Sequence, residues 1–186
     1  EIVGVVPYDA LLDAAEYYLQ LNRFDRGAIL ERKVATVDST RPGHESVADF
    51  TARLAARAPT PGGGSAAAIA GAIGTALGEM VFAYTHPVGA APADWTDAVA
   101  ELSALRRRFL ELSDEDGASY EAVRKARRAL KEQPDDPDRR AAERAALRDA
   151  ALVPLETARR AARVLELLDE RGPSTRKALG SDLTTA

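Results

Sequence analysis

Cysteine is absent from the 186 residues of the sequence, and histidine occurs only twice, at His44 and His86. The absence of cysteine excludes a disulfide framework, a thiol nucleophile and any metal site built on cysteine ligands. Two histidines leave little for a histidine-rich metal centre, so we predict that the protein holds no metal. Neither a Ser–His–Asp order nor an HExxH spacing is present, so the common hydrolase and metalloprotease patterns have no support.

Aromatic residues are also scarce, at 5% of the sequence, which disfavours an all-β sandwich. Alanine accounts for about one residue in five, and such a composition favours helices. The hydrophobic content of 46% is enough for a core and argues against intrinsic disorder. The net charge of −4 argues against a dedicated nucleic-acid-binding protein.

The most apolar run, residues 65–84, consists largely of alanine and glycine and contains Glu79. It lacks the roughly 20 strongly apolar residues that a membrane span needs, and its internal position excludes a signal peptide. Together with the absence of cysteine, these features predict a cytoplasmic protein with no membrane partner.

The first 33 residues differ from the rest of the chain. Residues 1–7 (EIVGVVP) form a strand-like run, and residues 8–21 repeat apolar positions at helical spacing. A strand without a partner cannot satisfy its own backbone groups, and the later sequence offers no second strand. We therefore expect residues 1–33 to be a strand-helix remnant from the C-terminal end of another domain. Residues 34–45 carry Asp, Ser, Thr, Pro and Gly without periodicity, which indicates a linker.

From residue 46 onward the apolar spacing predicts helices only. Ser46 and Asp49 form an N-cap signature for the first of them. Three longer helices are expected at residues 65–85, 94–131 and 137–170. A last short helix is expected to be cut off at Ala186. For residues 46–186 we predict an all-α fold, an up-and-down helical bundle with long antiparallel helices.

The helix expected at residues 65–85 is apolar nearly all round, so we expect it in the middle of the bundle. Its large side chains share one face: Ile69, Ile73, Leu77, Met80 and Tyr84. Its small residues share another: Ala67, Gly71, Gly74 and Gly78. Each glycine lowers helix propensity by about 0.5–1 kcal/mol, so we infer that the glycine face lets a neighbouring element come close. The apolar stripes and the glycine face also predict self-association into at least a homodimer.

The turn Pro61-Gly62-Gly63-Gly64-Ser65 leads directly into this helix. Unpaired N–H groups at a helix N-terminus attract a carboxylate or phosphate, and glycines let such a ligand approach the backbone. The alternative is a tight turn between two packed helices. No lysine follows the glycines and no strand precedes them, so a nucleotide-binding loop is not supported.

Asp116 interrupts an apolar row on the helix expected at residues 94–131. The row consists of Leu102, Leu105, Phe109, Leu112, Asp116, Tyr120 and Val123. An inward-facing carboxylate is costly unless it is paired or hydrogen-bonded. Such a group suits general acid–base chemistry, and the alternative is a structural carboxylate bonded to Tyr or Arg.

Five segments resemble the formiminotransferase-cyclodeaminase family. Residues 50–68 (FTARLAARAPTPGGGSAAA) resemble its opening helix and TPGGGS loop, and residues 71–81 resemble the helix that follows. Residues 112–120 (LSDEDGASY) resemble its acidic stretch before an aromatic residue. Two short motifs, VPL at residues 153–155 and SDL at residues 181–183, resemble later ones.

The resemblance implies a cyclodeaminase-like helical domain at residues 46–186, truncated at its C-terminus. It also implies that the opening residues end a glutamate formiminotransferase domain in a bifunctional parent chain. The implied reaction closes the ring of 5-formimino-tetrahydrofolate to give 5,10-methenyl-tetrahydrofolate and ammonia, with tetrahydrofolate as substrate carrier and no metal. Asp116 would be the catalytic carboxylate, with Asp182 second. The folate, its glutamate tail included, would be bound by Pro61, Gly62, Gly63, Gly64, Ser65 and Tyr120.

Two alternatives to the cyclodeaminase stay open. The first is a methenyltetrahydrofolate cyclohydrolase on the same scaffold. The second is a non-catalytic helical module that dimerises and holds transferase domains together.

Overall fold

The computed structural model describes residues 8–20, 24–25, 29, 45–87 and 89–186. The chain forms two units, Glu1–Asp38 and Ser39–Ala186. In the first unit, helix α1 spans Tyr8–Tyr18, where the sequence predicts a helix. The strand predicted at residues 1–7 lies outside the described residues.

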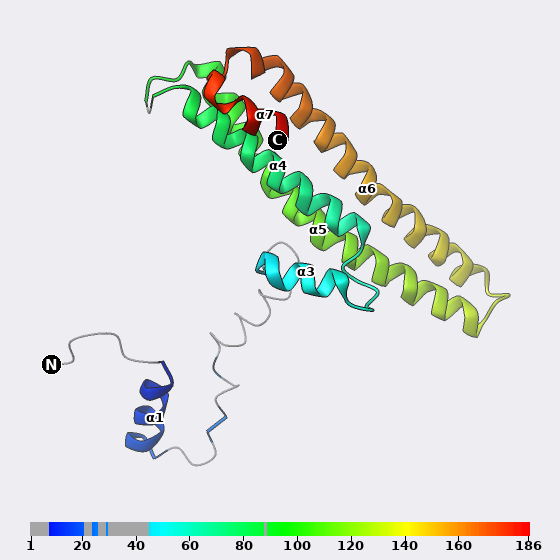
Figure 1. The fold of residues 1–186 in the computed structure, drawn as a ribbon. Coiled ribbons are helices and arrows are strands. Elements are labelled where there is room, and N and C mark those ends of the chain that lie inside the picture. The colour runs from blue at the N-terminus through cyan, green and yellow to red at the C-terminus, as the bar shows by residue number, and fades with distance from the viewer. Residues whose placement is uncertain (1–7, 21–23, 26–28, 30–44, 88) are drawn as a thin grey trace. The chain divides into compact units, whose positions relative to one another are not determined.

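Where the second unit is described, it contains one short helix, three long helices and a short last helix, namely α3 (Val47–Ala55), α4 (Gly63–Thr85), α5 (Ala93–Glu132), α6 (Pro137–Arg171) and α7 (Gly180–Thr185). Figure 1 shows α4, α5 and α6 side by side and alternating in direction. The described part of the chain contains no strand, and the all-helical class predicted from the sequence is confirmed there.

Local sequence explains where two of the helices begin. The hydroxyl of Ser46 accepts a hydrogen bond from the N–H of Asp49 at 3.1 Å, which confirms the predicted cap of α3. The carboxylate of Asp136 accepts from the N–H groups of Asp138 and Arg139, and Pro137 takes the first position of α6. Both caps satisfy N–H groups that a helix start otherwise leaves unpaired.

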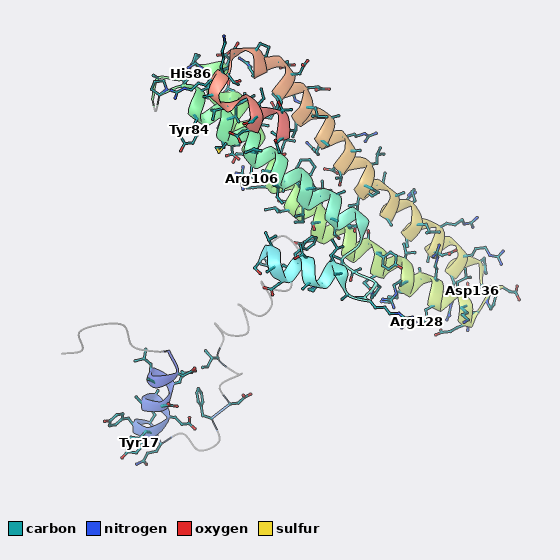
Figure 2. All side chains as sticks on the ribbon, in the orientation of Figure 1. Tyr17, Tyr84, His86, Arg106, Arg128 and Asp136 are labelled. Atoms are coloured by element: carbon teal, nitrogen blue, oxygen red, sulfur yellow. The ribbon has the colours of Figure 1, made fainter. Side chains whose placement is uncertain are left out.

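The core lies between α4, α5 and α6, and the aromatic rings of Phe82 and Trp95 close it at one end. Its largest fully buried side chains include Phe82, Phe109, Leu102 and Leu112. Trp95 packs against Phe82, with ring centroids 5.3 Å apart, and its Nε1–H donates to the carbonyl of Phe82 at 3.0 Å. Figure 2 places Tyr84 and His86 at this end of the long helices, and Arg128 and Asp136 at the other.

Helix α4 buries one face, which the apolar pattern of the sequence did not identify. The residues that pack inward are mainly small, namely Ser65, Ala68, Ala72, Thr75, Gly78, Val81 and Phe82. Of the large residues grouped on one face in the sequence, Ile73 is 58% exposed and Tyr84 is 63% exposed, whereas Met80 packs against the core. Helix α4, expected in the middle of the bundle, contacts α5, α6 and α7, while Ile73 and Tyr84 are exposed in the described chain.

Large side chains from the neighbouring helices fill the space beside the small residues of α4. A Cβ at Gly71 would lie 2.8 Å from the ring of Phe109 on α5, and one at Gly78 would lie 2.8 Å from Leu168 on α6. The predicted close approach on the glycine face is confirmed at these two positions.

Helix α4 is also long and apolar enough to cross a membrane, by length and composition only, with about a third of its most apolar window buried. A core helix of a soluble protein meets the same criterion, and one face of α4 packs on α5 and α6. The sequence expectation of no membrane partner therefore stays a prediction.

Candidate active site

The glycine turn begins α4. Gly62 is the N-cap and its carbonyl accepts the first helical hydrogen bond, from Ala66 at 3.0 Å. Pro61 is buried, Gly63 is exposed, and Ser65 has no exposed surface. The turn thus presents two kinds of position, one open to solvent and one sealed inside the bundle.

Asp116 of α5 reaches this turn and bonds to Ser65. The backbone N–H and the hydroxyl of Ser65 each lie 2.8 Å from the same carboxylate oxygen, Oδ2 of Asp116. Asp116 itself is half-buried. A carboxylate that accepts from the first turn of a helix satisfies an otherwise unpaired N–H and lies at the positive end of the helix dipole.

Ser113, one turn before Asp116, adds a second connection between α4 and α5. Its hydroxyl donates to the carbonyl of Ser65 at 3.3 Å, and its own carbonyl lies 3.1 Å from the hydroxyl of Ser65. Both serines are fully buried. These contacts fix the start of α4 against α5 next to the carboxylate.

Gly64 leaves the space that the carboxylate occupies. A Cβ at Gly64 would overlap Oδ1 of Asp116 and lie 2.9 Å from Oδ2. At Gly62 and Gly63 a Cβ would meet nothing within 4 Å. Of the three glycines, Gly64 is therefore the one whose missing side chain makes room for Asp116.

The other predicted site residues lie at different distances from this contact. Tyr120 lies on the same side of α5 as Asp116, because it follows Asp116 by one turn of the helix. Its side chain is 46% exposed. Asp182 is half-buried on α7. The end of α7 lies against Gly74, where a Cβ would be 2.5 Å from the carbonyl oxygen of Ala186.

The position of α7 separates the two predicted carboxylates. Gly74 lies ten residues along α4 from Gly64, about 15 Å at the rise of a helix, and Figure 1 shows α7 beside the far half of α4. The contacts of α7 therefore join Asp182 to a different part of the bundle from Asp116.

The two histidines do not join the site in the described chain. His44 lies outside the described residues. His86 is half-buried and meets the ring of Trp95 edge-on, with centroids 4.7 Å apart. Among the described residues no three His, Cys, Asp or Glu side chains cluster so as to hold a metal.

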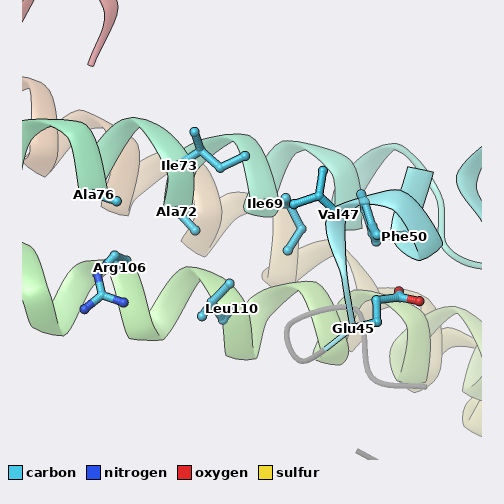
Figure 3. A pocket seen from close by; sticks show the side chains of 9 residues that line it. All are labelled: Glu45, Val47, Phe50, Ile69, Ala72, Ile73, Ala76, Arg106 and Leu110. Atoms are coloured by element: carbon cyan, nitrogen blue, oxygen red, sulfur yellow. The ribbon is translucent and has the colours of Figure 1, made fainter. Parts of the chain in front are cut away.

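Sequence reasoning missed a groove between α3, α4 and α5 (Figure 3). It has a volume of about 260 Å³ and is walled by Val47, Phe50, Ile69, Ala72, Ile73, Ala76 and Leu110. Glu45 and Arg106 are its charged residues. Ile69 lies one turn from Ser65, and Leu110 lies six residues, about 9 Å of helix, from Asp116. Neither Ser65 nor Asp116 lines the groove.

Both charged groups of the groove are paired. The carboxylate of Glu45 is buried and lies 2.7 Å from Nη1 of Arg53. The Nε–H of Arg106 donates to Glu79 of α4 at 2.9 Å. The sequence signal for this groove was weak, because residue 45 falls in the predicted linker and Arg106 stands in a run of three arginines that forms no recognisable motif.

Ion pairs line the contact between α5 and α6. Arg163 donates to Glu101 at 2.7 and 3.0 Å, and this bond lowers the pKa of the Glu101 carboxyl. Arg108 donates to Glu156 at 2.9 Å and likewise lowers the pKa of Glu156. Arg108 also bonds Glu115, as expected for a solvated face with paired charges. The pairs Arg163–Glu101 and Arg108–Glu156 join α6 to α5.

A helical bundle in which a carboxylate is held at a glycine turn fits an enzyme of the class expected from the sequence. A family model described as formiminotransferase-cyclodeaminase matches residues 46–186. The chain belongs to this family of folate-dependent cyclodeaminase and cyclohydrolase enzymes, and the resemblance seen in the sequence is confirmed.

Three relatives show how the similarity is distributed. The formimidoyltransferase-cyclodeaminase of Sus scrofa is 31% identical over 218 residues, which cover the whole of this chain and 40% of the relative. The methenyltetrahydrofolate cyclohydrolase of Methylorubrum extorquens is 35% identical over 131 residues, 68% of this chain and 63% of the relative. The glutamate formimidoyltransferase of Thermoplasma acidophilum is 71% identical over 34 residues, 18% of this chain and 11% of the relative.

Proposed function

We propose that this chain is a formimidoyltetrahydrofolate cyclodeaminase, which converts 5-formimino-tetrahydrofolate into 5,10-methenyl-tetrahydrofolate and ammonia. The observation that carries the proposal is the half-buried Asp116 carboxylate, held at the glycine turn of a cyclodeaminase-family domain. A carboxylate is the group that this reaction needs, because protons must move between two nitrogens and the product is a cation.

The proposed mechanism uses Asp116 twice. The N10 amine attacks the formimino carbon and loses its proton, and the carboxylate accepts that proton as a general base. The formimino group reacts in its protonated form, so its nitrogen, which gains the N10 proton from the same carboxyl group, leaves as ammonia when the carbon–nitrogen bond breaks. The methenyl bridge carries one positive charge, and the ionised carboxylate stabilises it.

The folate is proposed to lie over the start of α4. Gly63 is exposed there, and Tyr120 is exposed one turn beyond Asp116. Gly62, Gly63 and Tyr120 are proposed to contact the folate, whereas Pro61 and Ser65, predicted beside them, are buried and Gly64 lies against Asp116. Asp182 stays the predicted second carboxylate. No metal takes part in the proposed reaction.

We also propose that the first 33 residues end a glutamate formimidoyltransferase domain. Support comes from the 71% identity to the Thermoplasma acidophilum transferase over 34 residues. The chain spans about 40% of the length of the mammalian relatives, so transferase activity is a proposal for the parent protein. The predicted cytoplasmic location stays a prediction.

The second candidate function is a methenyltetrahydrofolate cyclohydrolase, favoured by the identity of 35% to the Methylorubrum extorquens enzyme. One preparation tests both, with ammonia release from 5-formimino-tetrahydrofolate measured beside hydrolysis of the methenyl compound. The cyclodeaminase proposal predicts that ammonia release is faster than hydrolysis of the methenyl compound. Hydrolysis without ammonia release would favour the cyclohydrolase.

The third candidate is a dimerisation module without activity. The outward apolar face of α4, with Ile73 58% exposed, supports self-association through a second copy of the chain. Folate binding separates a module from an enzyme, because a ligand that binds only the folded state raises the melting temperature. A stable dimer whose melting temperature folate does not change would favour the module.

A further inference from the structure

We infer that Gly64 and Ser65 are positioning residues that hold the Asp116 carboxylate in one orientation, and that their part in the glycine turn is not to contact the folate. The inference rests on the proposed function, since it concerns how Asp116 is presented for catalysis. It divides the turn into an exposed part, Gly62 and Gly63, and a part that faces inward.

Ser65 is the first support for this division. Its side chain is fully buried, so a substrate cannot touch it. Its N–H and its hydroxyl both point to Oδ2 of Asp116, at 2.8 Å each. A hydroxyl and an N–H on one oxygen fix the rotation of a carboxylate, because charge-assisted hydrogen bonds are strong and directional. Oδ1 is then the oxygen assigned to proton exchange with the substrate.

Gly64 is the second support. Its missing side chain leaves the volume in which Oδ1 of Asp116 lies, and a Cβ there would overlap that oxygen. The overlapped atom belongs to a short side chain that is also tied to Ser65, so it cannot move aside without breaking the hydrogen bonds. Gly63, one position earlier, has open space where its Cβ would be, and this makes the two glycines a matched pair.

The register between α4 and α5 completes the arrangement. Ser113 and Ser65 bond each other's carbonyl oxygens at 3.3 and 3.1 Å. They hold the first turn of α4 at a fixed distance from the turn of α5 that carries Asp116. The carboxylate is therefore oriented by two helices before substrate arrives, which is the preorganisation that efficient proton transfer requires.

The test compares Gly64→Ala with Gly63→Ala in the full chain. We expect Gly64→Ala to lower kcat for ammonia release at least tenfold, with KM within threefold of the unaltered protein, because the carboxylate is displaced and the binding surface is kept. Gly63→Ala, on the exposed part of the turn, adds a Cβ that meets no protein atom and is expected to keep kcat within twofold, with any change confined to KM. Equal increases of KM in both variants, with kcat unchanged, would overturn the inference and make the turn a folate-binding loop.

A double-variant cycle keeps the inference testable if Gly64→Ala unfolds the protein. In an Asp116→Ala background the overlapped side chain is gone, so adding Gly64→Ala is expected to leave the melting temperature unchanged or raised. Equal losses of melting temperature in both backgrounds would overturn the inference. This readout needs no activity, so a protein inactive in both folate assays would refute the proposed function while the cycle still decides how Asp116 is held.

Discussion

Ser65 and Asp116, 51 residues apart in the sequence, are joined by two hydrogen bonds of 2.8 Å to a single carboxylate oxygen. The glycine turn and the inward carboxylate, which look like separate features in the sequence, form one site. The positive end of the α4 dipole therefore faces a carboxylate of the protein itself.

Substitution by alanine is predicted to raise the free energy of unfolding at Gly117 and to lower it at Gly71. A Cβ at Gly117 meets nothing within 4 Å, so Gly117→Ala is expected to stabilise α5 by about 0.5–1 kcal/mol. Gly71→Ala places a Cβ 2.8 Å from Phe109 and is expected to destabilise by about 1–3 kcal/mol. Urea unfolding measures both. Stabilisation by Gly71→Ala would mean that α4 and α5 are not packed as described.

Trp95→Phe is predicted to destabilise the bundle by about 1–3 kcal/mol, because the buried carbonyl of Phe82 loses its indole partner. Tyr84→Phe is the matched control: its ring is 63% exposed, and its loss of a hydroxyl is expected to change the free energy of unfolding by less than about 0.5 kcal/mol. Thermal unfolding followed by circular dichroism measures both variants. Equal effects would contradict the role given to the Trp95 hydrogen bond.

Ile73→Asp is predicted to abolish self-association, because it places a charge in the middle of the exposed apolar face of α4. Leu165→Asp on α6, where the side chain is 62% exposed, is the control and is expected to leave the oligomer intact. Light scattering with size-exclusion chromatography gives the mass of each variant. A dimer that survives Ile73→Asp would show that another surface is used.

Acid is predicted to destabilise the contact between α5 and α6. Hydrogen bonds from Arg163 and Arg108 lower the folded-state pKa of Glu101 and Glu156. Their stabilisation is therefore present above the ordinary glutamate value of about 4.3 and is lost as the pH falls through the lower folded-state values. Both carboxylates are partly exposed, so each pair contributes less than about 1 kcal/mol. Melting temperatures measured from pH 6 downward test this prediction. The melting temperatures of Glu101→Gln and Glu156→Gln are expected to fall less with decreasing pH than that of the unaltered chain.

Local patterns predicted most of the helices correctly. The helix expected at residues 94–131 is observed at Ala93–Glu132, and the one expected at 137–170 is observed at Pro137–Arg171. Regular three- and four-residue spacing and the Ser46 cap are signals carried within a few residues. Helix α4 begins two residues earlier than expected, inside the glycines, where its first turn is held by the bond from Ser65 to Asp116.

The same patterns do not show which face of a helix is buried or which residues far apart in the sequence contact each other. Two faces of α4 are apolar, and the sequence does not show that Phe109 and Leu168 fill the space beside the small residues. The sequence therefore left open which of the two faces is buried. The Asp116 row correctly indicated a carboxylate that faces inward, but its partner Ser65 is known only once α4 and α5 are placed side by side.

The most direct test of the account is the rate of methenyl-tetrahydrofolate formation from 5-formimino-tetrahydrofolate by Asp116→Asn, measured beside the unaltered chain. The amide keeps the size of the side chain and an oxygen that can accept from Ser65, while it removes the proton-transfer group. We predict a folded protein with an unchanged circular dichroism spectrum and a kcat lower by about 10²–10⁴. A folded Asp116→Asn variant that turns over at the rate of the unaltered chain would contradict the account.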